Sequence, residues 1–151
     1  MLATNSSLDQ LGLVAPVIIQ GKHLLRQLTS DVSDWDAPLS ADKKMEWIVW
    51  RDSLQSLEQL EIPRAYTAAC LSSAQHTDVF SDASVKAIAA VAYLKVTDGE
   101  GRCHVGFIIG KAKLAPTSAH TVPRLELRAA VLAVEIAELV VSELDIDPNN
   151  F

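Results

Sequence analysis

The spacing of hydrophobic residues changes twice along this chain, and the change limits the folds open to it. Up to about residue 60, apolar side chains recur at the three-to-four-residue intervals of amphipathic helices. Between residues 77 and 110 they alternate as in half-buried strands, and a long apolar run follows Pro123. This order predicts helices, then three antiparallel strands in meander order, then one long helix, which is an α+β or α/β fold.

Two helices are predicted in the first part of the chain. Pro16 suits the first turn of a helix, and the apolar stripe after it continues to about Thr29. Ser40 is a suitable N-cap for a second helix that continues to about Glu58. The loop between the two helices carries Trp35, which we expect to dock onto the core.

A linker of small residues, Thr67–Gln75, separates this helical part from the strands. We place a domain boundary there and predict a helical segment over residues 1–73 and a second domain over residues 74–151. The charge changes as well: residues 74–128 carry a net charge of +2, although the whole chain carries -6.

The second part of the chain predicts a meander. The Asp98-Gly99 pair marks the turn of a hairpin, and strict alternation is expected along the strand that follows it. The last helix has so few polar residues that we expect most of it to be buried. The predicted elements are strands at Thr77–Ser81, Ala87–Val96 and Cys103–Ile109, a connection at Lys111–Thr121, and a helix from Leu125 to about Glu143.

Composition excludes several classes of protein. Hydrophobic residues make up 49% of the 151 residues, which excludes intrinsic disorder. The apolar run at Leu11–Ile19 is too short to span a bilayer, and no basic region precedes it as in a secretion signal. The two cysteines, Cys70 and Cys103, form no CxxC pattern. We therefore expect an intracellular, cytoplasmic protein without membrane contact.

Asp82 is the first candidate site residue. It follows a short apolar strand, and alternation places its carboxylate on the same face as the ring of Phe80. A carboxylate beside an apolar ring is costly without a cation or a hydrogen-bond donor, and a metal ion is one such partner. The alternative is that Asp82 and Ser84 cap a turn, since both are common turn residues.

Glu126 is the second candidate. It lies near the start of the last predicted helix, beside the small residues Ala129, Ala130 and Ala133, which would allow close approach to a sheet. The alternative is a Glu that stabilises the positive first turn of that helix. The four histidines show no paired metal spacing, so we expect them at the surface or at sheet edges.

Five segments together resemble a known family. In order along residues 8–151, they are similar to the Pol polyprotein of BEL/Pao long-terminal-repeat retrotransposons, whose family is also labelled Pao retrotransposon peptidase. The resemblance covers a connection segment after the reverse transcriptase and the N-terminal part of a ribonuclease H-like domain. The segments are Leu8–Pro16, Trp35–Leu39, Ile62–Arg64, Phe80–Ser84 and Val122–Leu127.

The resemblance implies a function and a site. A ribonuclease H-like domain hydrolyses the RNA strand of RNA–DNA hybrids during reverse transcription, and its first strand and first helix supply an Asp and a Glu to two Mg²⁺ ions. These positions correspond to Asp82 and Glu126. The implied partners are the hybrid and the rest of the Pol polyprotein, namely reverse transcriptase and integrase, with a nuclear phase in addition to the cytoplasmic one.

The resemblance also limits what to expect of this chain alone. Proteolysis is not implied, because the chain has no Asp-Thr-Gly or Asp-Ser-Gly triplet. The family's third carboxylate belongs to a fourth strand, expected beyond Phe151, so we expect a fragment that binds Mg²⁺ weakly and is inactive alone. The missing strand would leave the edge of Thr77–Ser81 bare and prone to association. The alternative is a non-catalytic remnant or domesticated interaction module, which the acidic net charge favours.

Overall fold

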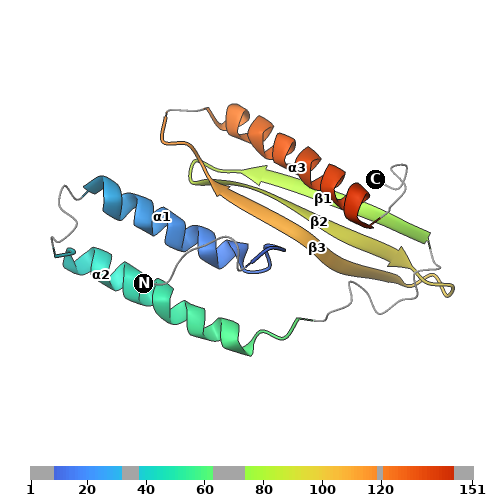
Figure 1. Ribbon diagram of the computed structural model, residues 1–151, viewed down its shortest axis with the longest axis horizontal. Coiled ribbons are helices and arrows are strands. Elements are labelled where there is room, and N and C mark those ends of the chain that lie inside the picture. Colours follow the sequence, from blue (N-terminus) through green and yellow to red (C-terminus); the bar gives the residue numbers. More distant parts are fainter. Residues whose placement is uncertain (1–8, 32–37, 63–73, 119–120, 145–151) are drawn as a thin grey trace.

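The computed structural model describes residues 9–31, 38–62, 74–118 and 121–144 (Figure 1). Helices come first, three strands follow, and a long helix ends the described chain. The predicted order of elements, and with it the α+β fold class, is confirmed. The elements are α1 (Ala15–Asp31), α2 (Ala41–Ser53), the 3-10 helix η1 (Leu54–Gln59), β1 (Ala74–Ala83), β2 (Ala87–Thr97), β3 (Cys103–Leu114) and α3 (Val122–Leu144).

The three strands form one antiparallel sheet in the order β1-β2-β3. β1 pairs with β2 along its whole length, from Ala74 opposite Thr97 to Ala83 opposite Ile88. β1 is therefore longer than predicted, and it is an edge strand of the described sheet. None of the described helices is long and apolar enough to cross a membrane.

One face of the sheet forms the core with α3. The predicted apolar face of β2 is confirmed, since each of its members is buried. α3 crosses β1 and β2 on this face (Figure 1) and contributes residues spaced at three and four along the helix. The buried residues are Ile88, Ala90, Ala92, Leu94 and Val96 of β2 and Leu125, Ala129, Leu132, Ile136 and Val140 of α3.

β3 departs from the strict alternation that its sequence predicts. The register shifts where Ala92 and Tyr93 of β2 meet β3, so that Ala92 lies opposite Ile109 and Tyr93 opposite Phe107. The bulge allows Ile108 and Ile109 to be buried together. The strand then continues to Leu114, so the prediction that residues 111–114 belong to a connection was wrong.

α3 is buried on one side only, which corrects the expectation that most of it is covered. Three large apolar residues on the opposite side of the helix are exposed: Leu127 at 65%, Val131 at 53% and Val134 at 57%. They recur at i, i+4 and i+7, so they form one stripe that faces away from the sheet.

The two predicted N-terminal helices are present, and they pack as a hairpin beside β3 (Figure 1). The second is shorter than predicted, because the α-helix ends at Ser53 and the chain continues as the 3-10 helix η1. Gly21 of α1 lies under the indole ring of Trp50, and there is no room there for a Cβ atom. The Trp50 Nε1–H group donates to the backbone oxygen of Val17 at 2.9 Å. Ser40 caps α2 as predicted, accepting from the backbone N–H of Lys43 at 3.5 Å.

The segment before α1 attaches this hairpin to the sheet. The backbone N–H of Gly110 in β3 donates to the oxygen of Leu11 at 2.8 Å. Gly12 lies against Gly110 with a φ of +76°, and a Cβ built on it would fall 1.7 Å from the Gly110 oxygen. Only glycine fits this crossing. Arg26 adds a hydrogen bond from α1 to the backbone oxygen of Ala115.

Three sequence predictions fall outside the described residues: the docking of Trp35, the conformation of most of the Thr67–Gln75 linker, and the segment that ends at Phe151. The division at residues 73 and 74 stays a prediction. α1 nevertheless packs directly against β3, so residues on the two sides of the proposed boundary are in contact.

Candidate functional site

Asp82 lies inside β1, one residue before its end, and opposite Ala89 of β2. Its neighbour Ala83 packs against the core on the α3 side. Because side chains alternate along a strand, Asp82 points to the other face of the sheet. There it lines a hollow of about 670 Å³ together with Phe80. The prediction that Phe80 and Asp82 share a face is confirmed.

The hollow beside Asp82 has aromatic and aliphatic walls. Tyr93 lies edge-to-face with Phe80 at 6.2 Å and with Phe107 at 6.0 Å between ring centroids. The opposite wall consists of Leu13, just before α1, and of Pro16 and Ile19 in the first turns of that helix. The Asp82 side chain itself is exposed, and no hydrogen bond or ion pair joins it to another described residue.

The turn between β1 and β2 is capped by Ser84 rather than by Asp82. The Ser84 hydroxyl accepts from the backbone N–H groups of Lys86 and Ala87 at 3.2 and 3.1 Å. The Ser84 backbone N–H closes the turn by donating to the Ala87 oxygen at 2.8 Å. Asp82 has no part in this network, so the turn-capping alternative holds for Ser84 alone.

Glu126 lies in the second turn of α3, with its side chain exposed. The helix begins at Val122, where the N–H groups of Arg124 and Leu125 donate to the Thr121 oxygen. The first turn of α3 contains no acidic residue. The favourable effect of a helix N-terminus on a carboxylate fades beyond the first turn. Stabilisation of the positive first turn, the alternative role of Glu126, therefore does not explain a Glu at this position.

Two observations place Glu126 on the β1 side of α3. Ala133 and Ala137 line a groove together with residues of β1. Glu126 precedes Ala133 by seven residues and Ala137 by eleven, which are whole turns of a helix, so the three share one side. The opposite side of α3 faces β3, where Glu135 pairs with Lys113 at 3.6 Å.

Both predicted ligands lie at one end of the sheet. Ala83 and Leu125, their immediate neighbours in sequence, belong to the same small hydrophobic cluster with Ile88, Ala115 and Ala129. In Figure 1 the end of β1 and the start of α3 lie together at this end of the molecule. Among the described residues, no three His, Cys, Asp or Glu side chains gather closely enough to form a metal site.

The donor set therefore suits Mg²⁺ only in part. Asp82 and Glu126 offer hard carboxylate oxygens, and Mg²⁺ is commonly held by one or two carboxylates while waters and substrate phosphates supply its other ligands. Two carboxylates supply less negative charge than the full set of ligands of a closed metal site. The described residues are consistent with one part of a magnesium site.

Asp98 is a strongly perturbed carboxylate that the sequence predicted only as a turn residue. It accepts from the backbone N–H groups of Arg102 and Glu100, both at 2.9 Å, and its other oxygen pairs with the Arg102 guanidinium. His104 lies 3.2 Å from the same oxygen. The hydrogen bonds from Arg102 are the main cause of a lowered pKa of about 2 for Asp98. These donors engage both carboxylate oxygens, so Asp98 stabilises the β2–β3 turn.

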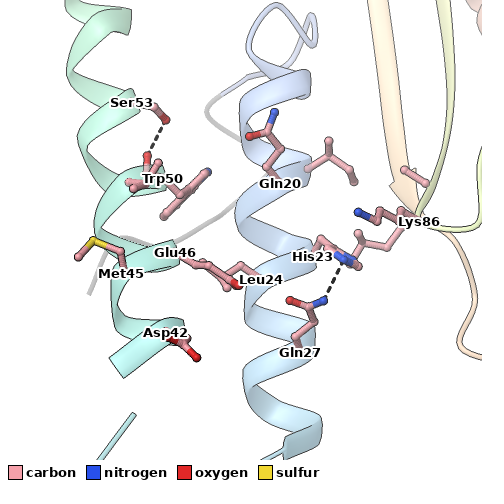
Figure 2. Close-up of a pocket in the computed structure, with 14 residues that line it drawn as sticks. Gln20, His23, Leu24, Gln27, Asp42, Met45, Glu46, Trp50, Ser53 and Lys86 are labelled. Atoms are coloured by element: carbon pink, nitrogen blue, oxygen red, sulfur yellow. Dashed lines mark hydrogen bonds between the residues drawn. The ribbon is translucent and has the colours of Figure 1, made fainter. Parts of the chain in front are cut away.

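A second hollow, of about 730 Å³, lies between α1 and α2 (Figure 2). Trp50 and Leu24 form its apolar walls, and Lys86 approaches from the β1–β2 turn. His23 lines it and shares a hydrogen bond with Gln27 at 3.2 Å, while the Nδ1 atom of His23 is buried without a partner among the described residues. Asp82 and Glu126 do not line this hollow. No sequence motif predicted it.

The other histidines follow the sequence expectation where they are described. His76 is exposed on the edge strand β1, and half-buried His104 lies on β3, the other edge strand. His120 is outside the described residues.

Comparison with known proteins identifies the family of this chain. A family model described as the Pao retrotransposon-like RNaseH-like domain matches residues 2–151. The chain belongs to this family. The resemblance inferred from the five sequence segments is thereby confirmed, and the match continues across the boundary predicted at residues 73 and 74. No curated protein and no solved structure matches the chain.

Membership of the Pao RNase H-like family relates the positions of Asp82 and Glu126 to a known type of domain. The chain is a retrotransposon RNase H-like region, and it places Asp82 on its first strand and Glu126 on the helix after the third strand. Their role as metal ligands remains a prediction.

Proposed function

We propose that this Pao RNase H-like chain forms part of a Mg²⁺-dependent nuclease that hydrolyses the RNA strand of RNA–DNA hybrids during reverse transcription. The observation that carries the proposal is the position of Asp82. Its carboxylate is exposed, has no partner among the described residues, and lies beside aromatic rings at the end of the sheet where α3 presents Glu126.

Asp82 and Glu126 would hold the metal from two different elements. β1 fixes Asp82 through its pairing with β2, and the cluster around Leu125 fixes the start of α3 against that sheet. Bound Mg²⁺ would lower the pKa of an attacking water and stabilise the leaving oxygen of the phosphodiester. Asp82 and Glu126 would orient the metal and supply the negative charge that retains it.

Family membership supports a hybrid substrate and Pol partners for this chain. An RNA strand is distinguished from DNA by its 2′-hydroxyl groups and by the shape of its groove. The net charge of +2 over residues 74–128 favours contact of this part of the chain with phosphates. The reverse transcriptase and integrase of the same Pol polyprotein would be its partners, in the cytoplasm and in a nuclear phase.

A non-catalytic interaction module is the second candidate. It is favoured by the net charge of -6 over the chain and by the lack of a three-ligand group among the described residues. Proteins that bind nucleic acid on their own are usually basic. This candidate predicts that Asp82 and Glu126 can both be neutralised without functional loss.

The test is hydrolysis of a labelled hybrid by a Pol protein that contains this chain together with the strands expected to follow it. Asp82→Asn and Glu126→Gln should each lower Mg²⁺-dependent cleavage by about 100-fold or more, the scale on which one preorganised electrostatic group is felt in catalysis. Neutral amides keep the shape of the side chains but lack the charge that holds the divalent ions.

Matched controls separate a metal role from a general loss of charge. Asp78→Asn changes another carboxylate on the same face of β1, and Glu138→Gln changes another exposed Glu of α3. Both controls should keep cleavage within about threefold of the parent protein, since substitutions away from a site have small effects. An active parent enzyme that tolerates Asp82→Asn and Glu126→Gln would contradict the proposal.

A further inference from the structure

Four basic side chains lie where α3 faces β3. Arg128 and Arg124 precede Glu135 by seven and eleven residues, which are whole turns of a helix, so the three share one side of α3. That side faces β3, because Glu135 pairs with Lys113 of the strand at 3.6 Å. Lys111 lies two residues before Lys113 and therefore points to the same face of β3.

α1 adds two cations from the other side of β3. In Figure 1, β3 lies between α1 and α3, and α1 packs against it. Lys22 of α1 lines a hollow of about 330 Å³ together with Lys111 and Lys113. Arg26, one turn after Lys22, donates a hydrogen bond to the backbone oxygen of Ala115. We call the following six residues the basic strip: Lys22 and Arg26 of α1, Lys111 and Lys113 of β3, and Arg124 and Arg128 of α3.

The basic strip concentrates positive charge on an acidic chain. Glu135 pairs with Lys113, and Asp9 lines the hollow of Lys22. With these two carboxylates counted, the six cations leave a net charge of +4, whereas the whole chain carries -6. The carboxylate of Asp9 is also engaged with α1, since it accepts from the backbone N–H groups of Leu13 and Val14 at 2.9 and 3.0 Å. Charge of one sign gathered on one surface attracts ligands of the opposite sign.

Most of these cations are available to a ligand. Arg124 and Arg128 are exposed, and no ion pair joins either of them to another described residue. The same holds for the half-buried Lys22 and Lys111. Guanidinium and ammonium groups are the side chains that proteins use to bind phosphates. Because the strip extends from α1 across β3 to α3, its charges suit a polyanion better than one small anion.

We propose that the basic strip binds the phosphate backbone of a nucleic-acid duplex, namely the RNA–DNA hybrid that the chain is proposed to cleave. The inference rests on the proposed function, because that function supplies the duplex. A duplex presents a regular row of negative charges, about one per 1.7 Å of its axis. An acidic protein segment is the other polyanion that such a surface attracts. Nucleic acid is favoured because half of the strip is lysine, which is depleted in protein–protein interfaces, whereas protein–DNA interfaces are strongly positive.

The basic strip and the candidate site lie on opposite sides of the same turns of α3. Arg124 and Arg128 face β3, whereas Glu126 lies on the β1 side, so they are separated by about the 10 Å diameter of a helix. One strand of a duplex covers this distance in about three nucleotides, at about 3.4 Å of axis each. The strip would thus hold the duplex about three nucleotides from the bond that is cut. Its members are positioning residues that do not touch the reacting atoms.

The first experiment measures binding alone, by fluorescence anisotropy of a labelled RNA–DNA hybrid titrated with the chain in EDTA. Phosphate contacts release counterions, so the logarithm of the binding constant falls with the logarithm of the salt concentration, with a slope of about -0.9 per contact. The double variant Lys111→Gln, Arg128→Gln removes two contacts. It should raise Kd about tenfold or more at about 0.1 M salt and make the slope shallower by about two.

Two further double variants are matched controls. Lys44→Gln with Lys95→Gln removes the same charge from exposed positions of α2 and β2 outside the basic strip, and should keep Kd within about threefold of the parent value. Lys111→Arg with Arg128→Lys keeps the charge of the strip and should keep the salt slope of the parent chain. Thermal melts of all three double variants check that the fold is retained.

Polyglutamate in place of the hybrid tests the other class of partner. A parent chain that binds polyglutamate but not the hybrid would assign the strip to an acidic protein segment and overturn the proposal. A parent chain that does not bind the hybrid at about 50 mM salt would overturn it as well. An unchanged salt slope in the Lys111→Gln, Arg128→Gln variant would have the same meaning, because the two side chains would then make no phosphate contact.

A second experiment separates this inference from the nuclease proposal, using a Pol protein that contains the chain and the strands expected to follow it. Lys111→Gln with Arg128→Gln should raise KM for the hybrid about tenfold and leave kcat within about threefold of the parent value. Asp82→Asn should lower kcat and leave binding in EDTA no weaker. If Asp82→Asn kept full cleavage while the double variant still lost binding, the nuclease site would be wrong and the strip would stand. If Asp82→Asn lost kcat while the double variant kept the parent KM, the strip alone would be wrong.

Discussion

The two faces of the sheet are built for different purposes. The face under α3 is closed by aliphatic residues of β2 and α3 that are buried almost completely. The other face carries the ring cluster of Phe80, Tyr93 and Phe107 with Asp82 beside it, and among the described residues it is bordered by the segment before α1 and the start of that helix. The comparison teaches that stability resides mainly on one face, which leaves the other free to present a carboxylate to solvent.

The largest expected effect tests the closed face. Leu132→Ala removes a side chain that is 2% exposed in the core and should lower the free energy of unfolding by about 2–5 kcal/mol. Leu127→Ala makes the same change on the same helix, at a side chain that is 65% exposed. It should lower the free energy of unfolding by no more than about 0.5 kcal/mol. Urea unfolding of both variants provides the measurement. Similar losses would mean that α3 is covered on both sides.

A smaller effect tests how α1 is attached beside the open face. Gly12→Ala forces a Cβ atom onto the Gly110 oxygen at a positive φ, and should lower the free energy of unfolding by about 1–3 kcal/mol. Gly99→Ala is the control, because a Cβ atom there meets nothing within 4 Å. A thermal melt that shows no difference between the two variants would contradict the close crossing of residues 11–12 over β3.

The sequence predicted the elements better than their contacts. The apolar alternation of β2, the cap at Ser40 and the turn at Asp98-Gly99 are local signals, and the structure confirms them. The bulge in β3 was missed because burying Ile108 and Ile109 together depends on α3, which is distant in sequence. The crossing of Gly12 over Gly110 joins residues about a hundred positions apart, and no local pattern encodes it.

The candidate site was predictable to a similar degree. Strand alternation predicted that Asp82 lies on the same face of the sheet as Phe80, and the structure confirms this. Its assignment to a two-metal site came from the family resemblance. The cluster that ties Ala83 to Leu125, and so brings the two carboxylates to one end of the sheet, is a property of tertiary packing.

The smallest effect concerns the β2–β3 turn, at the end of the sheet away from the candidate site. Asp98 has a pKa of about 2 in the folded chain, against a usual value of 3.8. Its contribution to stability is therefore complete above the usual value and is lost as the pH falls towards 2. Asp98→Asn should destabilise the chain at neutral pH, and its difference from the parent should shrink in acid. Unfolding curves across this pH range provide the measurement, and a difference that grows in acid would contradict the assigned hydrogen bonds.

The central proposal is that Asp82 on the open face and Glu126 at the start of α3 together hold one metal site. Mn²⁺ in place of Mg²⁺ tests this directly, since paramagnetic broadening in NMR spectra detects even a weakly bound ion. We expect the amide signals of residues 81–83 and 125–127 to broaden together, and Asp82→Asn to remove the broadening from both segments. Broadening at only one of the two segments, or broadening that persists in Asp82→Asn, would contradict a site shared by Asp82 and Glu126.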